Sequence, residues 1–149
     1  MKNILTKRAM TLFELLAVIV ILGIIIAIGF PTVNRLISNS RKDAFAANVN
    51  SYISAAKTDA LSDWAATGKG LTKTYYIASS DKPNTGNSEQ VTFDITGLSA
   101  GAVEIVVSDD GSVTSVKIVK DFKSTQGNLT IKTTNENVLN KTFNRTDVK

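Results

Sequence analysis

Glu14 has the most unusual setting of any ionisable residue in this sequence. It directly precedes residues 15–34, a run of 20 residues without a charge. Placing a charged side chain inside a bilayer costs roughly 3 kcal/mol, so an ionisable residue at the edge of such a run indicates a function and a charged partner. The run itself contains no basic side chain that could neutralise the carboxylate.

A cut between Ala9 and Met10 would create a suitable partner. The new α-amino group would then stand four residues before Glu14. An amine and a carboxylate at this depth can pair between neighbouring chains. Such a pair would offset the desolvation of both charges and fix the stagger of adjacent helices, as buried polar groups fix the register of coiled coils. The function expected of this segment is therefore the assembly of neighbouring chains.

Other kinds of chemistry find little support. The 149 residues contain neither cysteine nor histidine, so disulfides, thiolate nucleophiles, cysteine-bound metals and the usual general base near neutral pH are excluded. We expect no enzymatic activity, no cofactor and no metal. Asp109, Asp110 and Asp121 lack the spaced oxygen ligands of a calcium site, and the Asp-Asp-Gly sequence that begins at Asp109 is typical of a turn.

The element that must position Glu14 is an apolar helix. Residues 15–30 consist only of Leu, Ala, Val, Ile, Gly and Phe. A 20-residue helix is about 30 Å long, which matches the hydrocarbon core of a bilayer. Of the net charge of +4, residues 1–9 carry +3 (three basic residues and no acid). This basic leader places the N-terminus in the cytoplasm, and the small remaining charge predicts no specific binding of nucleic acid.

The helix is expected to continue beyond the apolar run. Pro31 should kink it, because proline lacks a backbone donor. From Val33 to Trp64 apolar residues recur in steps of three or four, which predicts an amphipathic helix that stops at Gly68 and Gly70. Residues 12–66 would then form one bent helix of about 80 Å.

The remainder has the composition of a small sheet. Strand signals occur at residues 74–78, 91–95, 103–108, 113–119 and 129–133, with a hairpin turn at residues 109–111. The expected fold class is α+β, with the second half of a long kinked helix packed on a small antiparallel sheet. The expected organisation is a leader (1–9), a membrane or core helix (10–31) and a head domain (32–149). Within the head we expect helix 32–67, loop 68–90, sheet 91–140 and a tail 141–149 that is frayed or at most an edge strand.

The N-terminal sequence Lys7-Arg8-Ala9-Met10-Thr11-Leu12-Phe13-Glu14-Leu15-Leu16 resembles the class III signal segment of type IV prepilins and pseudopilins. The resemblance covers residues 7 to about 38. It comprises the short basic leader, the small residue before the cut, Thr11 and Leu12, the glutamate four residues after Met10, the apolar run, and Phe30 followed by Pro31. The family usually has glycine where this chain has Ala9, and alanine is the next smallest side chain.

The resemblance implies a specific maturation. In that family a membrane peptidase removes the leader and N-methylates the new terminus. Ala9 and Met10 would flank the scissile bond, Met10 would be methylated, Glu14 would be the register carboxylate, and Pro31 would be the helix kink. From Gly70 onward the resemblance is only architectural.

The function implied is that of a structural subunit of a type IV pilus-like filament. Its partners would be copies of itself and related pilins, the prepilin peptidase and methyltransferase, and the assembly machinery in the membrane. Before assembly the chain would cross the cytoplasmic membrane once, and afterwards it would lie in an extracellular pilus. The alternatives are a pseudopilin of a type II secretion or competence DNA-uptake machine, and a monomeric membrane-anchored binding module. An ordinary signal peptide cut near Ala27-Ile28-Gly29 would leave Glu14 without a purpose.

Overall fold

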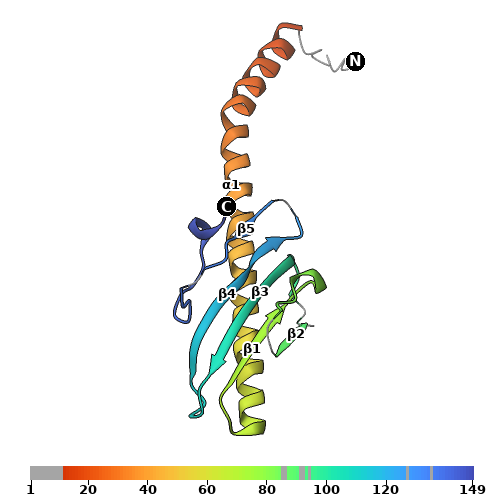
Figure 1. Cartoon of the computed structure of the whole chain (residues 1–149). Helices are drawn as coiled ribbons and strands as arrows, with labels where there is room; N and C mark the ends of the chain where they lie inside the picture. Colours follow the sequence, from red (N-terminus) through yellow and green to blue (C-terminus); the bar gives the residue numbers. More distant parts are fainter. Residues whose placement is uncertain (1–11, 85–86, 91–92, 94, 127, 135) are drawn as a thin grey trace, which may run out of the picture. The chain divides into compact units, whose positions relative to one another are not determined.

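The computed structural model describes residues 12–84, 87–90, 93, 95–126, 128–134 and 136–149. It contains one long helix, α1, followed by a five-stranded sheet (Figure 1), so the expected α+β class is confirmed. The chain divides into two compact units, residues 1–38 and residues 39–149. The second unit contains the later part of α1 and the whole sheet, and we call it the head.

Helix α1 spans Leu12–Thr67, within one residue of the predicted end. The residue that follows, Gly68, has φ of 64°, a conformation that side chains disfavour, and its N–H donates to the carbonyl of Trp64 at 2.7 Å. This left-handed glycine ends the helix as the sequence predicted.

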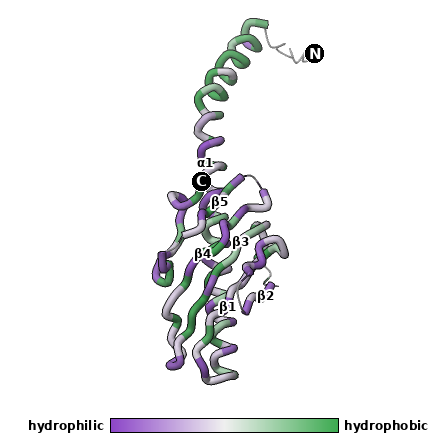
Figure 2. Tube along the Cα trace, in the orientation of Figure 1, coloured by the Kyte–Doolittle hydropathy of each residue, from purple (hydrophilic) through white to green (hydrophobic). Residues whose placement is uncertain are grey.

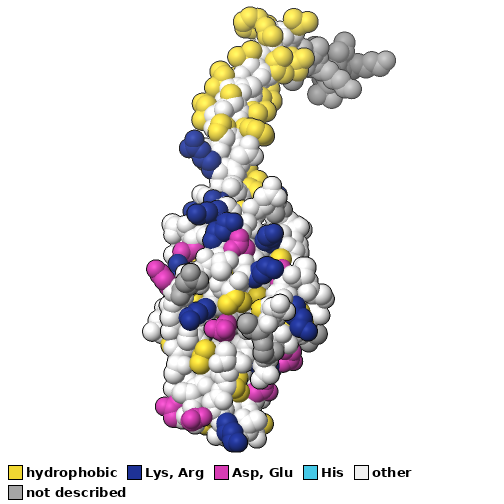
Figure 3. All heavy atoms as spheres, viewed as in Figure 1, with side chains coloured by type: hydrophobic (Ala, Val, Ile, Leu, Met, Phe, Trp, Pro, Cys, Tyr) yellow, Lys and Arg dark blue, Asp and Glu magenta, His cyan; other side chains and the backbone are white. Residues whose placement is uncertain are grey.

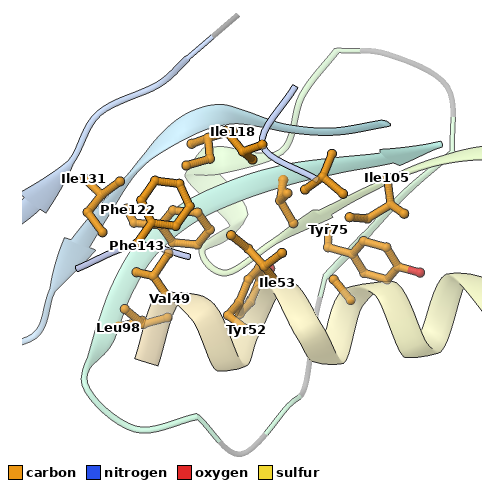
Figure 4. Packing of buried hydrophobic residues seen from close by; sticks show 14 of the residues in the cluster. Val49, Tyr52, Ile53, Tyr75, Leu98, Ile105, Ile118, Phe122, Ile131 and Phe143 are labelled. Carbon is orange, nitrogen blue, oxygen red and sulfur yellow. The ribbon is translucent and has the colours of Figure 1, made fainter. Parts of the chain in front are cut away.

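One face of α1 forms the core of the head, as Figure 4 shows for Val49, Tyr52 and Ile53. The buried positions follow helical spacing: Phe45, Ala46, Val49, Tyr52, Ile53, Ala56 and Ala60. They pack against buried side chains of the sheet, among them Ile105, Ile118 and Phe122. The predicted packing of the amphipathic half of the helix on a sheet is therefore confirmed.

The sheet has the strand order β2-β1-β3-β4-β5. Its strands are β1 (Leu71–Tyr76), β2 (Ser88–Gln90), β3 (Leu98–Val107), β4 (Val113–Ser124) and β5 (Thr130–Ile131). Strands β3 and β4 form the predicted antiparallel hairpin, in which Val107 pairs with Val113 and Gly111 takes a φ of 82° in the turn.

The sheet departs from the predicted one at its β2 edge. The β1–β2 pair is parallel, whereas an antiparallel sheet was expected. Strand β1 overlaps the strand signal at residues 74–78 but begins three residues earlier, whereas β2 lies where the loop 68–90 was predicted. A short 3-10 helix, η1 (Ser79–Asp81), lies in the connection between the two strands. Phe93 and Ile95, from the predicted strand 91–95, lie outside any strand. The N–H of Ile95 donates to the carbonyl of Phe93 at 2.8 Å, and the other residues of this predicted strand lie outside the described residues.

The prediction of a frayed tail was wrong. Residues 145–147 form a 3-10 helix, η2 (Arg145–Asp147), capped by Asn144. Phe143 and Val148 are buried in the head core. The backbones of Lys149 and Thr130 exchange two hydrogen bonds of 3.0 Å. The tail is thus an integral part of the head.

Candidate functional site

The N-terminal part of α1 presents an apolar surface around its whole circumference. All large hydrophobic residues that are exposed in the described chain lie within residues 12–37, with the single exception of Val119. Figures 2 and 3 show these residues as a nearly continuous hydrophobic stretch. In the 18-residue window that marks α1 as long and apolar enough to cross a membrane, no residue is buried.

Such a surface requires an apolar partner. Contiguous exposed apolar patches on soluble monomers rarely exceed several hundred Å², and larger ones mark interaction sites with protein or lipid. The helix also satisfies its own backbone hydrogen bonds, which a segment must do in order to sit in lipid. Residues 12–37 can therefore be covered either by a bilayer or by other apolar helices.

Two of the predicted site residues belong to this segment. Glu14 lies in the first turn of α1, and Pro31 lies inside the helix, which continues on both sides of it. Ala9 and Met10, the residues of the predicted cleavage and methylation site, lie outside the described residues. The structure thus places Glu14 at the beginning of the apolar helix, while its role in register stays a prediction.

In the head, the densest group of charges surrounds Lys73 on β1. Its ammonium contacts Asp59 of α1 at 3.2 Å, Asp63 of α1 at 2.5 Å, and Glu89 of β2. Tyr75 donates its hydroxyl to the same oxygen of Asp59 at 2.9 Å. This group of ion pairs, which we call the Lys73 cluster, ties together α1, β1 and the edge strand β2.

The Lys73 cluster keeps its ammonium protonated. Burial lowers the pKa of Lys73, but hydrogen bonds with Asp63, Glu89 and Asp59 outweigh it and hold the pKa well above its usual value. Burial, together with the hydrogen bond to Asp59, raises the pKa of the Tyr75 hydroxyl. The three carboxylates lie within 4.8 Å of one another and could in principle ligate a cation. Lys73 already supplies the positive charge, and a metal would have to displace it.

The three aspartates weighed for calcium do not form a common site. Asp109 accepts a hydrogen bond from the N–H of Gly70 at 2.7 Å, and Asp110 accepts hydrogen bonds from both Ser108 and Ser112 within its own turn. Asp121 accepts from Lys132 and Thr133, which hold its pKa well below the usual range. Each carboxylate is engaged by donors of the chain itself.

Sequence reasoning missed the Lys73 cluster. One signal was available, because Asp59 and Asp63 stand four residues apart and therefore on one face of a helix. Two carboxylates on one face of a helix repel each other, so this pattern predicts a basic side chain nearby. The cation comes from Lys73, ten residues after Asp63 and on a strand, and helical periodicity cannot identify such a partner.

Comparisons with known proteins add no family assignment. No protein-family model matches the chain, and no match was found among curated proteins or among solved structures. The resemblance to prepilins therefore rests on the residues of the N-terminal segment, beside an architecture of a long apolar helix and a small mixed sheet.

Proposed function

We propose that this chain is the structural subunit of a type IV pilus-like filament, processed at Ala9 and Met10 and assembled through the apolar part of α1. The observation that carries the proposal is the exposed apolar surface of residues 12–37, which begins beside Glu14. Before assembly lipid covers this surface. In the filament the same surface is covered by copies of the helix.

Exposed apolar residues are confined to one segment, which supports separate roles for the N-terminal helix in assembly and for the head in water. In the head the large hydrophobic side chains are packed into a core, with Val119 as the exception among the described residues. A chain of this kind can keep its head in water while its N-terminal helix moves from lipid into a bundle. The exchange loses little burial of apolar surface, since lipid and helix packing both exclude water.

Glu14 supplies the specificity that apolar packing lacks. Lipid-facing side chains slide past one another at low cost, whereas a carboxylate at the beginning of the helix favours the one stagger that brings an amine to it. In the proposed filament the amine is the methylated terminus of Met10 in a neighbouring copy.

Replacement of Glu14 tests this function. Glu14→Ala is expected to leave leader removal intact and to reduce surface filaments at least tenfold, because the substitution removes the register contact and leaves the apolar surface. Leu16→Ala, which shortens an apolar side chain two residues away, serves as the matched control and is expected to assemble. Normal filament yield from Glu14→Ala would contradict the register mechanism and favour a helix that acts only as a tether.

A further inference from the structure

The head has an open cavity at the end where its part of α1 begins. The cavity measures about 380 Å³, within the range of about 300–1,000 Å³ typical of binding pockets. Its walls include Arg41, Phe45 and Asn48 of α1, together with Gln126 and Leu129 from the segment that joins β4 to β5. The lining is partly apolar, and none of the lining residues is acidic.

Arg41 is the one charged residue in the wall of this cavity, and its guanidinium is available. Arg41 is exposed, and no hydrogen bond or ion pair of its side chain occurs among the described residues. The carboxylate of Asp43, two residues further along α1, accepts two hydrogen bonds from Arg145, at 3.0 and 2.9 Å. The positive charge of Arg41 thus lines a cavity that has no acidic residue in its wall.

The opposite end of the head carries a protruding acidic turn, residues 108–112 (Figure 1). Asp109 and Asp110 are both exposed at its tip. Three groups of Ser108 and Ser112 donate hydrogen bonds to one oxygen of Asp110, and the indole of Trp64 donates to the carbonyl of Asp109 at 3.3 Å. Within the described part of the chain, no basic side chain forms an ion pair with either carboxylate.

We propose that the acidic turn of one copy docks into the Arg41 cavity of a second copy, so that heads join end to end. The turn is held rigid before it binds, so docking orders few groups and costs little conformational entropy. In Asp109 and in Asp110 one carboxylate oxygen is engaged within the chain, while the other accepts no hydrogen bond among the described residues and can accept a charge-assisted one from the guanidinium of Arg41. This inference rests on the proposed function and adds to it a second contact, between heads.

The contact cannot form within one chain. Arg41 and Trp64, which touches the turn, are separated by 23 residues of α1, or about 35 Å of helix. Docking must therefore join two copies, through different surfaces on each. Such a head-to-tail contact leaves a free cavity and a free turn at the two ends and extends into an open polymer when the rotation does not close.

The absence of cysteine makes a clean cross-linking test possible. Gln126→Cys in the cavity wall and Lys69→Cys beside the acidic turn are combined in the full-length chain, so that Arg41, Asp109 and Asp110 all stay in place. Filaments are collected from cells, treated with a thiol-reactive bismaleimide long enough to bridge the two side chains, and separated under denaturing conditions. We expect a ladder of dimers and higher multimers, and no ladder from either single variant. The matched control pairs Gln126→Cys with Ser54→Cys, an exposed position near the middle of the head's part of α1, and should give no ladder.

A second variant keeps the inference testable if the cysteine pair disturbs the turn. Arg41→Glu changes an exposed side chain only, and we expect it to lower filament yield at least tenfold. Lys69→Glu makes the same change of charge beside the acidic turn and should assemble normally. Filaments of the double-cysteine variant that give no ladder, or an equal ladder from the pair with Ser54→Cys, or full assembly of Arg41→Glu, would overturn the docking contact alone. Absence of filaments from the wild-type chain would instead overturn the proposed function together with it.

Discussion

The side-chain amide of Asn50 pairs with the backbone of Phe143, 93 residues away. Its Nδ2 donates to the carbonyl of Phe143 at 2.8 Å, and its Oδ1 accepts from the N–H of Phe143 at 2.9 Å. Asn50 thus makes the two hydrogen bonds that a neighbouring strand would make. In a chain without cysteine, this contact fixes the C-terminal tail to α1.

Removal of this amide should weaken the head. Asn50→Ala leaves a buried backbone N–H and carbonyl without partners, which costs about 2–4 kcal/mol of unfolding free energy. Urea unfolding of the full chain in detergent, followed by the fluorescence of Trp64, the single tryptophan, measures the loss. Asn48→Ala, two residues earlier, is the matched control, since its side chain has no such backbone pairing among the described residues. An Asn50→Ala variant as stable as the control would contradict this role of the amide.

The Lys73 cluster should also be sensitive to substitution. Lys73→Met keeps the aliphatic stem but leaves three carboxylates close together without a cation. Because those carboxylates are between 38% and 56% exposed, solvent screens part of the repulsion, and we expect a loss of about 1–3 kcal/mol. Hydrogen exchange should accelerate most in β2, which Glu89 ties to the cluster. Lys123→Met, at an exposed lysine of β4, should change neither quantity. Unchanged exchange in β2 would show that the cluster does not hold this edge.

The acidic turn should have a distinctive titration. The hydroxyl of Ser108, followed by the backbone and hydroxyl of Ser112, lowers the pKa of Asp110 from 3.8 to about 2. A folded pKa below the unfolded one means that this carboxylate stabilises the head above about pH 4, and that the contribution is lost as the pH falls toward 2. Nuclear magnetic resonance titration of the aspartate carboxyls measures the value. Ser108→Ala should raise it, and a pKa near 4 in the wild-type chain would contradict the hydrogen-bonded turn.

Leader removal should depend on the size and charge of residue 9. Ala9→Asp places a charge beside the scissile bond and is expected to block processing, so that only the full-length chain is found on immunoblots. Ala9→Gly, which introduces the residue usual in prepilins, should be processed at least as fast as the wild-type chain. A shortened product from Ala9→Asp would count against cleavage by a prepilin peptidase.

The helix and the hairpin were predictable because local residues determine them. The spacing of apolar residues along α1 and the left-handed Gly68 fix the helix and its end within one residue. The turn around Gly111 likewise specifies the pairing of β3 with β4. In each case the deciding interactions lie within a few residues of one another, where periodicity and turn chemistry are informative.

The tail and the edge strand were not predictable from such patterns. Residues near Phe143 appear polar and featureless in the sequence, and their structure comes from partners such as Asn50 and Thr130 that lie far away in the chain. The edge strand β2 has only three residues, Ser88–Gln90, and none of them is apolar. It is held by its parallel pairing with β1 and by the ion pair between Glu89 and Lys73. The Arg41 cavity has the same origin, since β4 and α1 meet there only after folding.

The central claim is that the chain is processed at Ala9 and Met10 and assembled through α1. Its most direct test is mass spectrometry of the N-terminal peptide of the protein sheared from intact cells. The proposed function predicts a peptide that begins at N-methylated Met10, recovered in the filament fraction. A peptide that begins at Met1 would indicate an uncleaved anchor, and one that begins at Phe30 an ordinary secreted protein. Either of these results would contradict assembly as a pilus-like filament.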